Sequence, residues 1–189
     1  MHRALRDPTT YAIALDASPD GLTRGAWRAH RAGLGNAAFL VESVERLPSA
    51  LAEIADEVTV HFPWGSLLRG LLDGSRDVLD GLARLLRPEG ELRLLVSATS
   101  RDGYRATEPA TFAGLAPHYD RCGLTLIEAR WATPDEIAAS RSSWAKRLGP
   151  RPAVSATYRG HSRSSSRRGR TSAGTAPSHG IHSTSKEPS

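Results

Sequence analysis

Residues 57–68 read EVTVHFPWGSLL, and this stretch decides the fold of the chain. Valines alternate with polar residues up to Phe62, which is the pattern of a β-strand. Pro63 has no N–H to donate to a sheet, so the strand should end there. Trp64 would then lie just beyond the carboxyl end of a strand, where open α/β sheets bind their ligands. Residue types alone favour a different interpretation, a core tryptophan that closes the junction between strand and loop.

Strands and helices alternate along the rest of the chain. Strands are predicted at residues 10–16, 37–41, 57–62, 92–96 and 124–131, and helices at residues 19–30, 78–86, 109–121 and part of 134–148. This alternation predicts one α/β domain with a parallel sheet and crossover helices.

The positive charge of the chain is concentrated near its end. The sequence has 25 Lys and Arg against 20 Asp and Glu, a net charge of +5. Residues 151–189 hold seven of the basic and one of the acidic residues, a net of +6, so residues 1–150, with 18 basic and 19 acidic residues, have a net of −1. Overall basicity is therefore no argument for nucleic-acid binding by the domain, and a basic surface must come from local clustering.

Composition also limits the class of protein. The single cysteine, Cys122, excludes an internal disulfide and argues against a structural zinc site. No apolar run has the length of a membrane span, and the opening residues, MHRALR, lack the apolar core of a signal peptide. We therefore expect a cytoplasmic protein that is not bound to a membrane.

The last part of the chain differs in kind from the rest. It is rich in serine, arginine and glycine, and large apolar residues almost vanish after Tyr158. Such a segment buries too little surface to offset the entropy of ordering it. Residues 154–189 are therefore predicted to be a disordered tail, and residues 1–153 the domain. The histidines of this tail lack the spacing of metal ligands, and no metal is predicted.

Two acids are placed where a nucleotide could bind. Asp16 ends a predicted strand just before a helix, where an acid in a doubly wound fold accepts hydrogen bonds from a ribose. The alternatives are a carboxylate that caps the helix and a solvated acid of the loop. Glu45 follows the next strand and could contact an adenine edge or form a surface ion pair. The chain has no Ser/His/Asp order, Walker loop or Gly-x-Gly-x-x-Gly, so these acids belong to a nucleotide-type fold without hydrolytic residues.

Several stretches together resemble one family. The HFPWGSLL core resembles the central motif of aminoglycoside-resistance methyltransferases of the kanamycin/apramycin-resistance type, which modify N1 of an adenine in the decoding site of 16S ribosomal RNA. Residues 13–16 (IALD), 36–48 and 141–149 (RSSWAKRLG) resemble further motifs of that family, in the same order. The turn at residues 86–90 (LRPEG) resembles the Arg-Pro-Gly-Gly turn of Rossmann-type methyltransferases, with a glutamate in place of a glycine. The resemblance covers about residues 7–153 and implies an α/β, Rossmann-like class I S-adenosylmethionine methyltransferase fold.

The resemblance implies how the cofactor would be bound. S-adenosylmethionine would lie across the carboxyl ends of the strands. Its ribose would lie at Asp16 and its adenine at Glu45, with Phe62 and Pro63 beside it.

The resemblance also implies how the substrate base would be held. The target adenine must be flipped out of the RNA before its N1 can be methylated. Trp64 and Trp144 would stack on its two faces, each contact contributing on the order of 1–3 kcal/mol, and Ser142 or Ser143 would hydrogen-bond nearby. The N1 lone pair needs no general base, so no catalytic histidine or cysteine is required. Positioning of the reacting groups would lower the barrier by roughly 7–11 kcal/mol.

Basic residues near these motifs are candidate contacts to RNA phosphates, although each is equally an ordinary surface charge. They are Arg69, Arg101, Arg105, Lys146 and Arg147. The implied partner is 16S rRNA in the small ribosomal subunit, the implied result is aminoglycoside resistance, and we expect a monomer.

The chain departs from the family pattern at both ends. Members of the family begin with a strand and a glycine-rich loop that holds the methionine end of the cofactor, whereas only residues 1–7 precede the acid-ended strand here. The missing strand is central to the sheet, so we expect its two neighbours to have open edges and the cofactor to lack most of its floor. A misassigned start and a shifted reading frame near the end are the simplest explanation.

Three functions remain open from the sequence. The first is an rRNA adenine-N1 methyltransferase, active or inactive as this truncated chain. The second is a non-catalytic RNA-binding remnant, and the third is a small-molecule N-methyltransferase.

Overall fold

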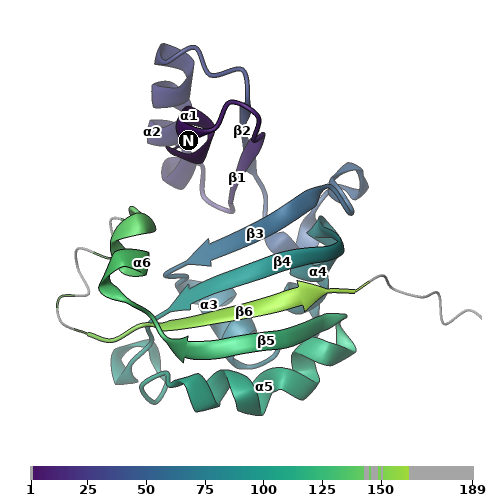
Figure 1. Cartoon of the computed structure of the whole chain (residues 1–189), viewed down its shortest axis with the longest axis vertical. Coiled ribbons are helices and arrows are strands. Elements are labelled where there is room, and N and C mark those ends of the chain that lie inside the picture. The colour runs from purple at the N-terminus through teal and green to yellow at the C-terminus, as the bar shows by residue number, and fades with distance from the viewer. Residues whose placement is uncertain (1, 143–144, 146–148, 150, 162–189) are drawn as a thin grey trace, which may run out of the picture.

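The computed structural model describes residues 2–142, 145, 149 and 151–161, and this part of the chain forms two separate sheets (Figure 1). A short helix, α1 (His2–Arg6), precedes them. The first sheet pairs β1 (Ala12–Asp16) with β2 (Ala37–Val41), and α2 (Pro19–Arg31) connects these strands. The second sheet has the strand order β3-β4-β6-β5. Its strands are β3 (Ala55–His61), β4 (Leu86–Val96), β5 (Leu124–Trp131) and β6 (Val154–Gly160).

Helices connect the strands of the second sheet. Between β3 and β4 lie α3 (Gly65–Leu72) and α4 (Arg76–Leu85), between β4 and β5 lies α5 (Pro109–Arg121), and α6 (Pro134–Ala139) follows β5. Short 3-10 turns lie at Val44–Arg46, Ser49–Leu51 and Ser100–Asp102. The predicted helices at 19–30 and 109–121 and the strands at 37–41 and 124–131 are confirmed, with shifts of one residue at most.

The prediction of a wholly parallel sheet is wrong for the last strand. β3 and β4 are parallel, but β6 runs antiparallel to both β4 and β5, between which it lies. The reason is the connection from β5 to β6, which contains α6 and returns the chain at the same end of the sheet. A strand that enters the sheet from the end at which the previous one left it must run in the opposite direction.

The predicted domain boundary at residue 153 is also corrected by the structure. β6 begins at Val154, directly after the predicted end of the domain, and burial alternates strictly along it. Tyr158, in the middle of β6, is fully buried, and its ring stacks on that of Tyr119 in α5 with 4.2 Å between the ring centroids. The first seven residues of the predicted tail are therefore part of the core. Residues 162–189 lie outside the described part of the chain.

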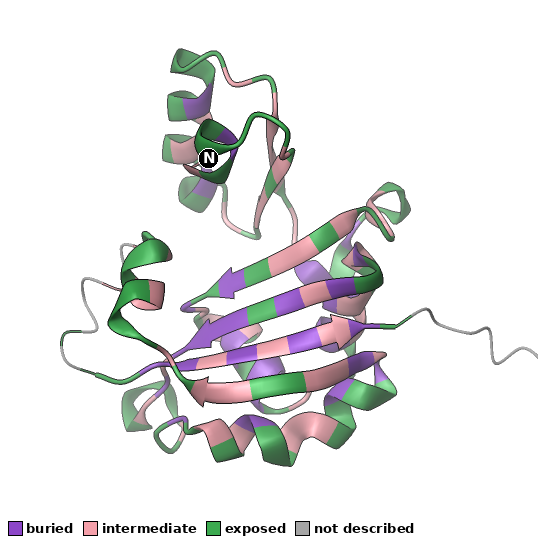
Figure 2. Ribbon diagram, in the orientation of Figure 1, coloured by how far each residue is buried: buried purple, intermediate pink, exposed green. Residues whose placement is uncertain are grey.

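The four-stranded sheet buries one face against helices and leaves much of the other exposed or half-buried (Figure 2). Thr59, Arg93 and Thr157 are partners in neighbouring strands and form part of the polar face. The residues directly before and after them along β4 and β6 point to the other face and are buried against the helices, as in other one-sided sheets. The core of this face contains Leu71 from α3, Leu79 from α4, Phe112 from α5, and Leu92, Leu94 and Ala156 from the strands.

The expected gap between the sheets is present. Figure 1 shows the β1–β2 unit above the free edge of β3, and within the described residues no strand pairs with β3 on that side. Side-chain contacts cross the gap: Arg3 of α1 donates hydrogen bonds to the carboxylate of Glu57 in β3, and Leu15 of β1 packs against the main core. In the described residues, no strand lies where the resemblance implies a central one, and these side-chain contacts join the two sheets.

Candidate cofactor and base-binding site

One edge of the second sheet carries the segments with Phe62, Pro63, Trp64 and Ser142, whereas Asp16 ends β1 and Glu45 follows β2 of the first sheet. β3, β4 and β5 all end at this edge, and β6 begins there, because β6 is antiparallel to its neighbours. The segments that follow these strands carry Phe62–Trp64, the loop after Val96, and α6 with Ser142. In an α/β sheet this carboxyl edge is the usual place for a ligand.

Trp64 is exposed, so the interpretation of it as a core residue is wrong. Its side chain and backbone together expose 70% of their surface, the largest value among the large apolar residues in the described part of the chain. It is the N-cap residue of α3 with extended backbone. Trp144 lies outside the described residues, so the pairing of two rings around a base stays a prediction.

Phe62 holds the turn that presents Trp64. Its φ is +50°, a left-handed conformation that is strained for a residue with a Cβ and that occurs preferentially at functional sites. Its N–H donates to the carbonyl of Leu95 at 2.7 Å, and its ring is buried with Leu95 and Ala153. Phe62 is therefore part of the wall under the site, and Pro63 directs the chain outward from it.

Asp16 folds back onto the start of α2. Its Oδ1 accepts a hydrogen bond from the N–H of Ser18 at 2.8 Å, and its Oδ2 lies so close to Gly21 that a Cβ there would overlap it. The carboxylate thus closes the turn that precedes α2, whose N-cap residue is Ser18 and has no side-chain capping bond. It remains exposed at the end of β1, so the ribose role stays a prediction.

Glu45 is exposed on a 3-10 turn that α4 holds in place. The carbonyl oxygen of Val44 lies against Gly81 so closely that a Cβ at Gly81 would overlap it. Only glycine allows this approach of the turn to the helix. Gly81 therefore sets the position of Glu45, although no pattern in the sequence indicates that these two segments meet.

Ser142 follows α6, and α6 has a well-capped start. The Thr133 N–H donates to Glu136 Oε2 at 2.8 Å, and the Glu136 N–H donates to Thr133 Oγ1 at 3.2 Å, a capping box. Arg130 also donates to both oxygens of Glu136 at 2.8 Å. Chiefly because of Arg130, the pKa of Glu136 is lowered to about 2. After α6, the Ser142 N–H donates to Ser140 Oγ at 3.3 Å.

Three of the five candidate RNA contacts lie on exposed positions of the described chain. Arg69 is on α3, and Arg101 and Arg105 are on the loop after β4. Lys146 and Arg147 lie outside the described residues.

A further cationic surface, on α2, was missed from the sequence. Arg24, Arg28 and Arg31 are exposed on this helix together with Trp27, which exposes 58% of its surface. The guanidinium of Arg31 lies 4.9 Å from the centroid of the Trp27 ring, a cation–π contact. No ion pair found in the described part of the chain involves these three arginines. Their spacing of four and three residues is the signal that could have identified this α2 cationic face.

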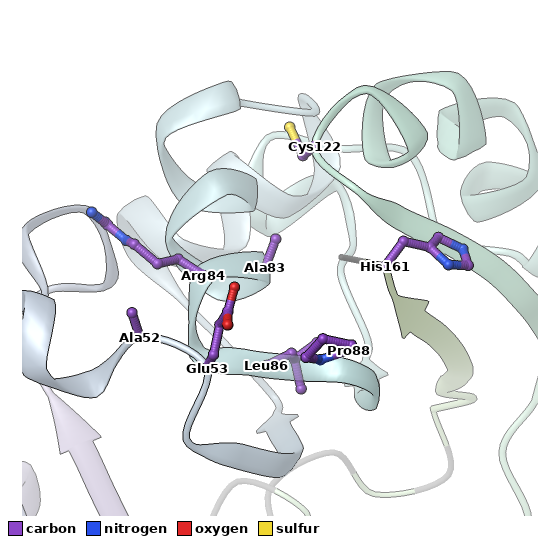
Figure 3. Close-up of a pocket in the computed structure, with 8 residues that line it drawn as sticks. All are labelled: Ala52, Glu53, Ala83, Arg84, Leu86, Pro88, Cys122 and His161. Atoms are coloured by element: carbon purple, nitrogen blue, oxygen red, sulfur yellow. The ribbon is translucent and has the colours of Figure 1, made fainter. Parts of the chain in front are cut away.

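A pocket elsewhere in the molecule is lined by none of the predicted site residues (Figure 3). It is lined by Glu53, Arg84, Pro88, Cys122 and His161, among others. These residues precede β3 and β5, end α4, begin β4 or follow β6, which places the pocket at the amino edge of the parallel strands, opposite Trp64.

In the described residues, no helix is long and apolar enough to cross a membrane.

The strand order, the antiparallel β6 and the site at the carboxyl edge together define the class: a Rossmann-like class I methyltransferase fold.

Comparisons with known proteins identify the family. Residues 1–158 match the family described as NpmA: 16S rRNA (adenine(1408)-N(1))-methyltransferase. The 16S rRNA (adenine(1408)-N(1))-methyltransferase of Streptoalloteichus tenebrarius is 31% identical over 160 residues, which cover 77% of this chain and 72% of that protein. The chain belongs to this family of methyltransferases.

Solved structures agree with this assignment. A point mutant of the 16S rRNA (adenine(1408)-N(1))-methyltransferase from Catenulisporales acidiphilia, crystallised with the cosubstrate SAM, has a TM-score of 0.77 at 25% identity, over 86% of this chain and 80% of that one. The 16S rRNA methyltransferase KamB has a TM-score of 0.75 at 28% identity, over 85% and 81% of the two chains.

Proposed function

We propose that this chain transfers a methyl group from S-adenosylmethionine to N1 of adenine 1408 in 16S rRNA and thereby gives resistance to aminoglycosides. The observation that carries the proposal is the exposed ring of Trp64, held at the carboxyl edge of a methyltransferase sheet by the strained turn at Phe62. An aromatic ring in this place is suited to stack on a base that has left the RNA helix.

The described residues fit the adenosine half of S-adenosylmethionine. Asp16 offers an exposed carboxylate for the ribose hydroxyls, and Glu45 offers a second one for the adenine amino group. Phe62 is buried with Leu95 and Ala153 at the end of β3, and Pro63 follows it directly before Trp64. In the family pattern, a strand that pairs between β1 and β3 is followed by a glycine-rich loop. The described residues contain no such strand and loop, so the methionine half of S-adenosylmethionine has fewer contacts.

In methyl transfer to adenine N1, the main role of the side chains is to position the base and the cofactor. When bound, S-adenosylmethionine supplies an electrophilic methyl group on a sulfonium. Adenine N1 has a free lone pair, so no residue has to remove a proton before attack. The role of Trp64, with Trp144 and Ser142 as its proposed partners, is to hold the flipped base in line, and such positioning lowers a barrier by roughly 7–11 kcal/mol.

Docking on the RNA would use two groups of cations. Arg69, Arg101 and Arg105 lie on the segments that follow β3 and β4. The α2 cationic face, on the helix that follows β1, adds a second group. Both would contact phosphates of the small ribosomal subunit, in the cytoplasm and with the protein as a monomer.

The test is methylation of small ribosomal subunits by the purified full chain with labelled S-adenosylmethionine, followed by primer extension. A stop at the decoding-site adenine is expected. If the folded chain binds small-subunit RNA but gives neither incorporation nor calorimetric binding of S-adenosylmethionine, the enzyme proposal is wrong and the RNA-binding remnant replaces it. Incorporation into small molecules without a stop on the RNA would instead support the small-molecule enzyme.

A further inference from the structure

The loop after β4, residues 98–107, is closed at its base by a reciprocal pair of hydrogen bonds. The Ala98 N–H donates to Thr107 Oγ1 at 3.0 Å, and the Thr107 N–H donates to the Ala98 carbonyl at 3.2 Å. Both residues are buried, and Thr107 is the buried polar residue of the described core. Because these bonds are shielded from water, the two ends of the loop are fixed relative to the sheet.

The tip of the loop is also ordered by its own contacts. Thr99 and Asp102 form a capping box, in which the Thr99 N–H donates to Asp102 Oδ2 at 2.9 Å. Gly103 then ends the turn with a φ of +84°, which glycine adopts without strain. Arg101 and Arg105 lie on either side of this glycine, so their backbone positions are set before any RNA binds.

One side-chain hydrogen bond joins this loop to α3. The hydroxyl of Tyr104 donates to Asp73 Oδ1 at 3.0 Å. Asp73 is the C-cap residue of α3, and its N–H donates to the carbonyl of Arg69 at 2.8 Å. Helix α3 therefore has Trp64 as its N-cap residue and Asp73 as its C-cap residue, and Asp73 accepts the hydrogen bond from the loop after β4. Partial burial, with the bond to Asp73, raises the pKa of Tyr104.

Arg69, Arg101 and Arg105 lie on the two segments that this hydrogen bond joins. Arg69 belongs to the last turn of α3, which ends at Asp73, and the other two flank Tyr104 in the chain. All three side chains are exposed, and none takes part in the ion pairs found in the described part of the chain. Three such cations on two segments act together on one RNA backbone only when the segments are fixed relative to each other, since otherwise binding must pay their ordering entropy.

We propose that Tyr104 and Asp73 are positioning residues: their hydrogen bond aligns Arg69, Arg101 and Arg105 into one preformed surface for rRNA phosphates beside Trp64. The inference rests on the proposed function for the identity of the RNA. The bond itself touches neither the cofactor site nor the base site, so its loss is expected to affect docking and not the chemical step.

Two pairs of variants separate this role from general damage. Tyr104→Phe removes the hydroxyl alone, and Tyr11→Phe is its matched control, because Tyr11 is 62% exposed and none of the hydrogen bonds found in the described chain involves it. Asp73→Ala removes the acceptor, whereas Asp73→Asn keeps an oxygen that can accept from Tyr104. Tyr104→Phe and Asp73→Ala are expected to behave alike, and Tyr11→Phe and Asp73→Asn to resemble the unchanged protein.

The first measurement is cleavage by trypsin after Arg105, which reports on the loop whatever the enzyme does. Faster cleavage there in Tyr104→Phe and Asp73→Ala, at equal thermal stability, is expected. Unchanged cleavage would overturn the positioning role.

The second measurement is methylation kinetics on small ribosomal subunits. The KM for the subunit is expected to rise about 2- to 10-fold, the range for loss of one hydrogen bond, with kcat unchanged. A fall in kcat at constant KM, or no change in either, would overturn the inference while leaving the proposed function intact. Absence of methylation by the unchanged protein would overturn both, and the trypsin result would then show only a structural contact.

Discussion

At the residue scale, Trp64 combines high exposure with a fixed backbone, so its ring can be changed without changing the fold. Trp64→Ala is expected to alter the free energy of unfolding by no more than about 0.5 kcal/mol, as for other exposed sites. If the ring stacks on the target base, the loss of about 1–3 kcal/mol lowers kcat/KM for rRNA methylation by about 5- to 150-fold.

The control for this change is Trp64→Phe, which keeps an aromatic face and should retain most of the activity. Methylation of small subunits and thermal unfolding of each variant provide the measurements. Equal activity of the alanine and phenylalanine variants would show that stacking is not the role of this ring.

Gly81 is a second residue at which a small change has a large expected effect. A methyl group there overlaps the carbonyl of Val44, so Gly81→Ala must displace either the turn that carries Glu45 or the helix α4. We expect a loss of about 1–3 kcal/mol of stability, typical of overpacking, together with weaker binding of S-adenosylmethionine in calorimetry.

Gly114→Ala is the matched control for Gly81→Ala. Gly114 lies inside α5 with open space where a Cβ would be, so the change should stabilise the protein by about 0.5–1 kcal/mol. Equal behaviour of the two variants in thermal unfolding would contradict the packing role of Gly81.

Sequence patterns predicted where these residues lie but not what they touch. The exposure of Trp64 followed from Pro63 and from the resemblance, against the average behaviour of tryptophan. The bond from the Ser18 N–H to Asp16 could not be singled out from the sequence, because a carboxylate before a helix suits a ribose, a helix cap and solvent equally well. The contact of Val44 with Gly81 joins segments far apart in sequence, and no local pattern carries that information.

At the scale of elements, α6 depends on an acid whose charge is stabilised in the folded state. The pKa of Glu136 falls from its ordinary value of 4.5 to about 2, mainly because Arg130 donates to it. A carboxylate with a lowered pKa contributes stability above its ordinary pKa, and this contribution is lost as the pH falls toward about 2. As the pH falls from 4.5 to about 2, the native protein should therefore lose the stability that the Glu136 carboxylate contributes. The Glu136→Gln variant has no such carboxylate, so it should not show this loss.

The measurement is urea unfolding at several pH values between neutrality and acid for both proteins. Their difference should be largest at neutral pH and shrink as the medium becomes acidic. A difference that does not change with pH would show that Glu136 acts through its shape rather than its charge.

The α2 cationic face predicts a change in the salt dependence of RNA binding. Replacing Arg24, Arg28 and Arg31 with alanine should reduce the slope of log K against log salt concentration by about 0.7–0.9 for each phosphate that these arginines neutralise. The measurement is binding to small-subunit RNA over a salt series. Arg121→Ala, at the other edge of the molecule in the last turn of α5, is the control and should leave the slope unchanged.

The elements were predicted better than their directions. Pro19 and Pro109 mark the starts of α2 and α5, and helical periodicity carries each helix to its end, so both were located from the sequence. β6 was missed because SATYRG contains few large apolar residues and resembles the tail that follows it. Its antiparallel direction depends on where α6 returns the chain, which is a property of tertiary structure.

At the scale of the whole molecule, the two sheets differ in how well they are buried. Residues of β1 and β2 are intermediate or exposed throughout, whereas β4 and β6 contain fully buried residues at alternate positions. Because the sheets share no strand pairing in the described chain, the smaller one can open without disturbing the larger.

Hydrogen exchange followed by mass spectrometry tests this independence. Backbone amides of β1 and β2 are expected to exchange with a lower free energy of opening than those of β4 and β6. The same opening free energy in all four strands would show one cooperative unit, bridged effectively by Arg3, Glu57 and Leu15.

The polar face of the four-stranded sheet has a consequence for how this chain can vary over time. Thr59, Arg93 and Thr157 face away from the core, so substitutions at such positions leave the buried packing unchanged. Their neighbours on the other face have no such freedom, because each is enclosed by α3, α4 or α5. Drift in sequence should therefore accumulate on every second residue of these strands, and two members of the family can diverge widely while every strand of the sheet keeps its place.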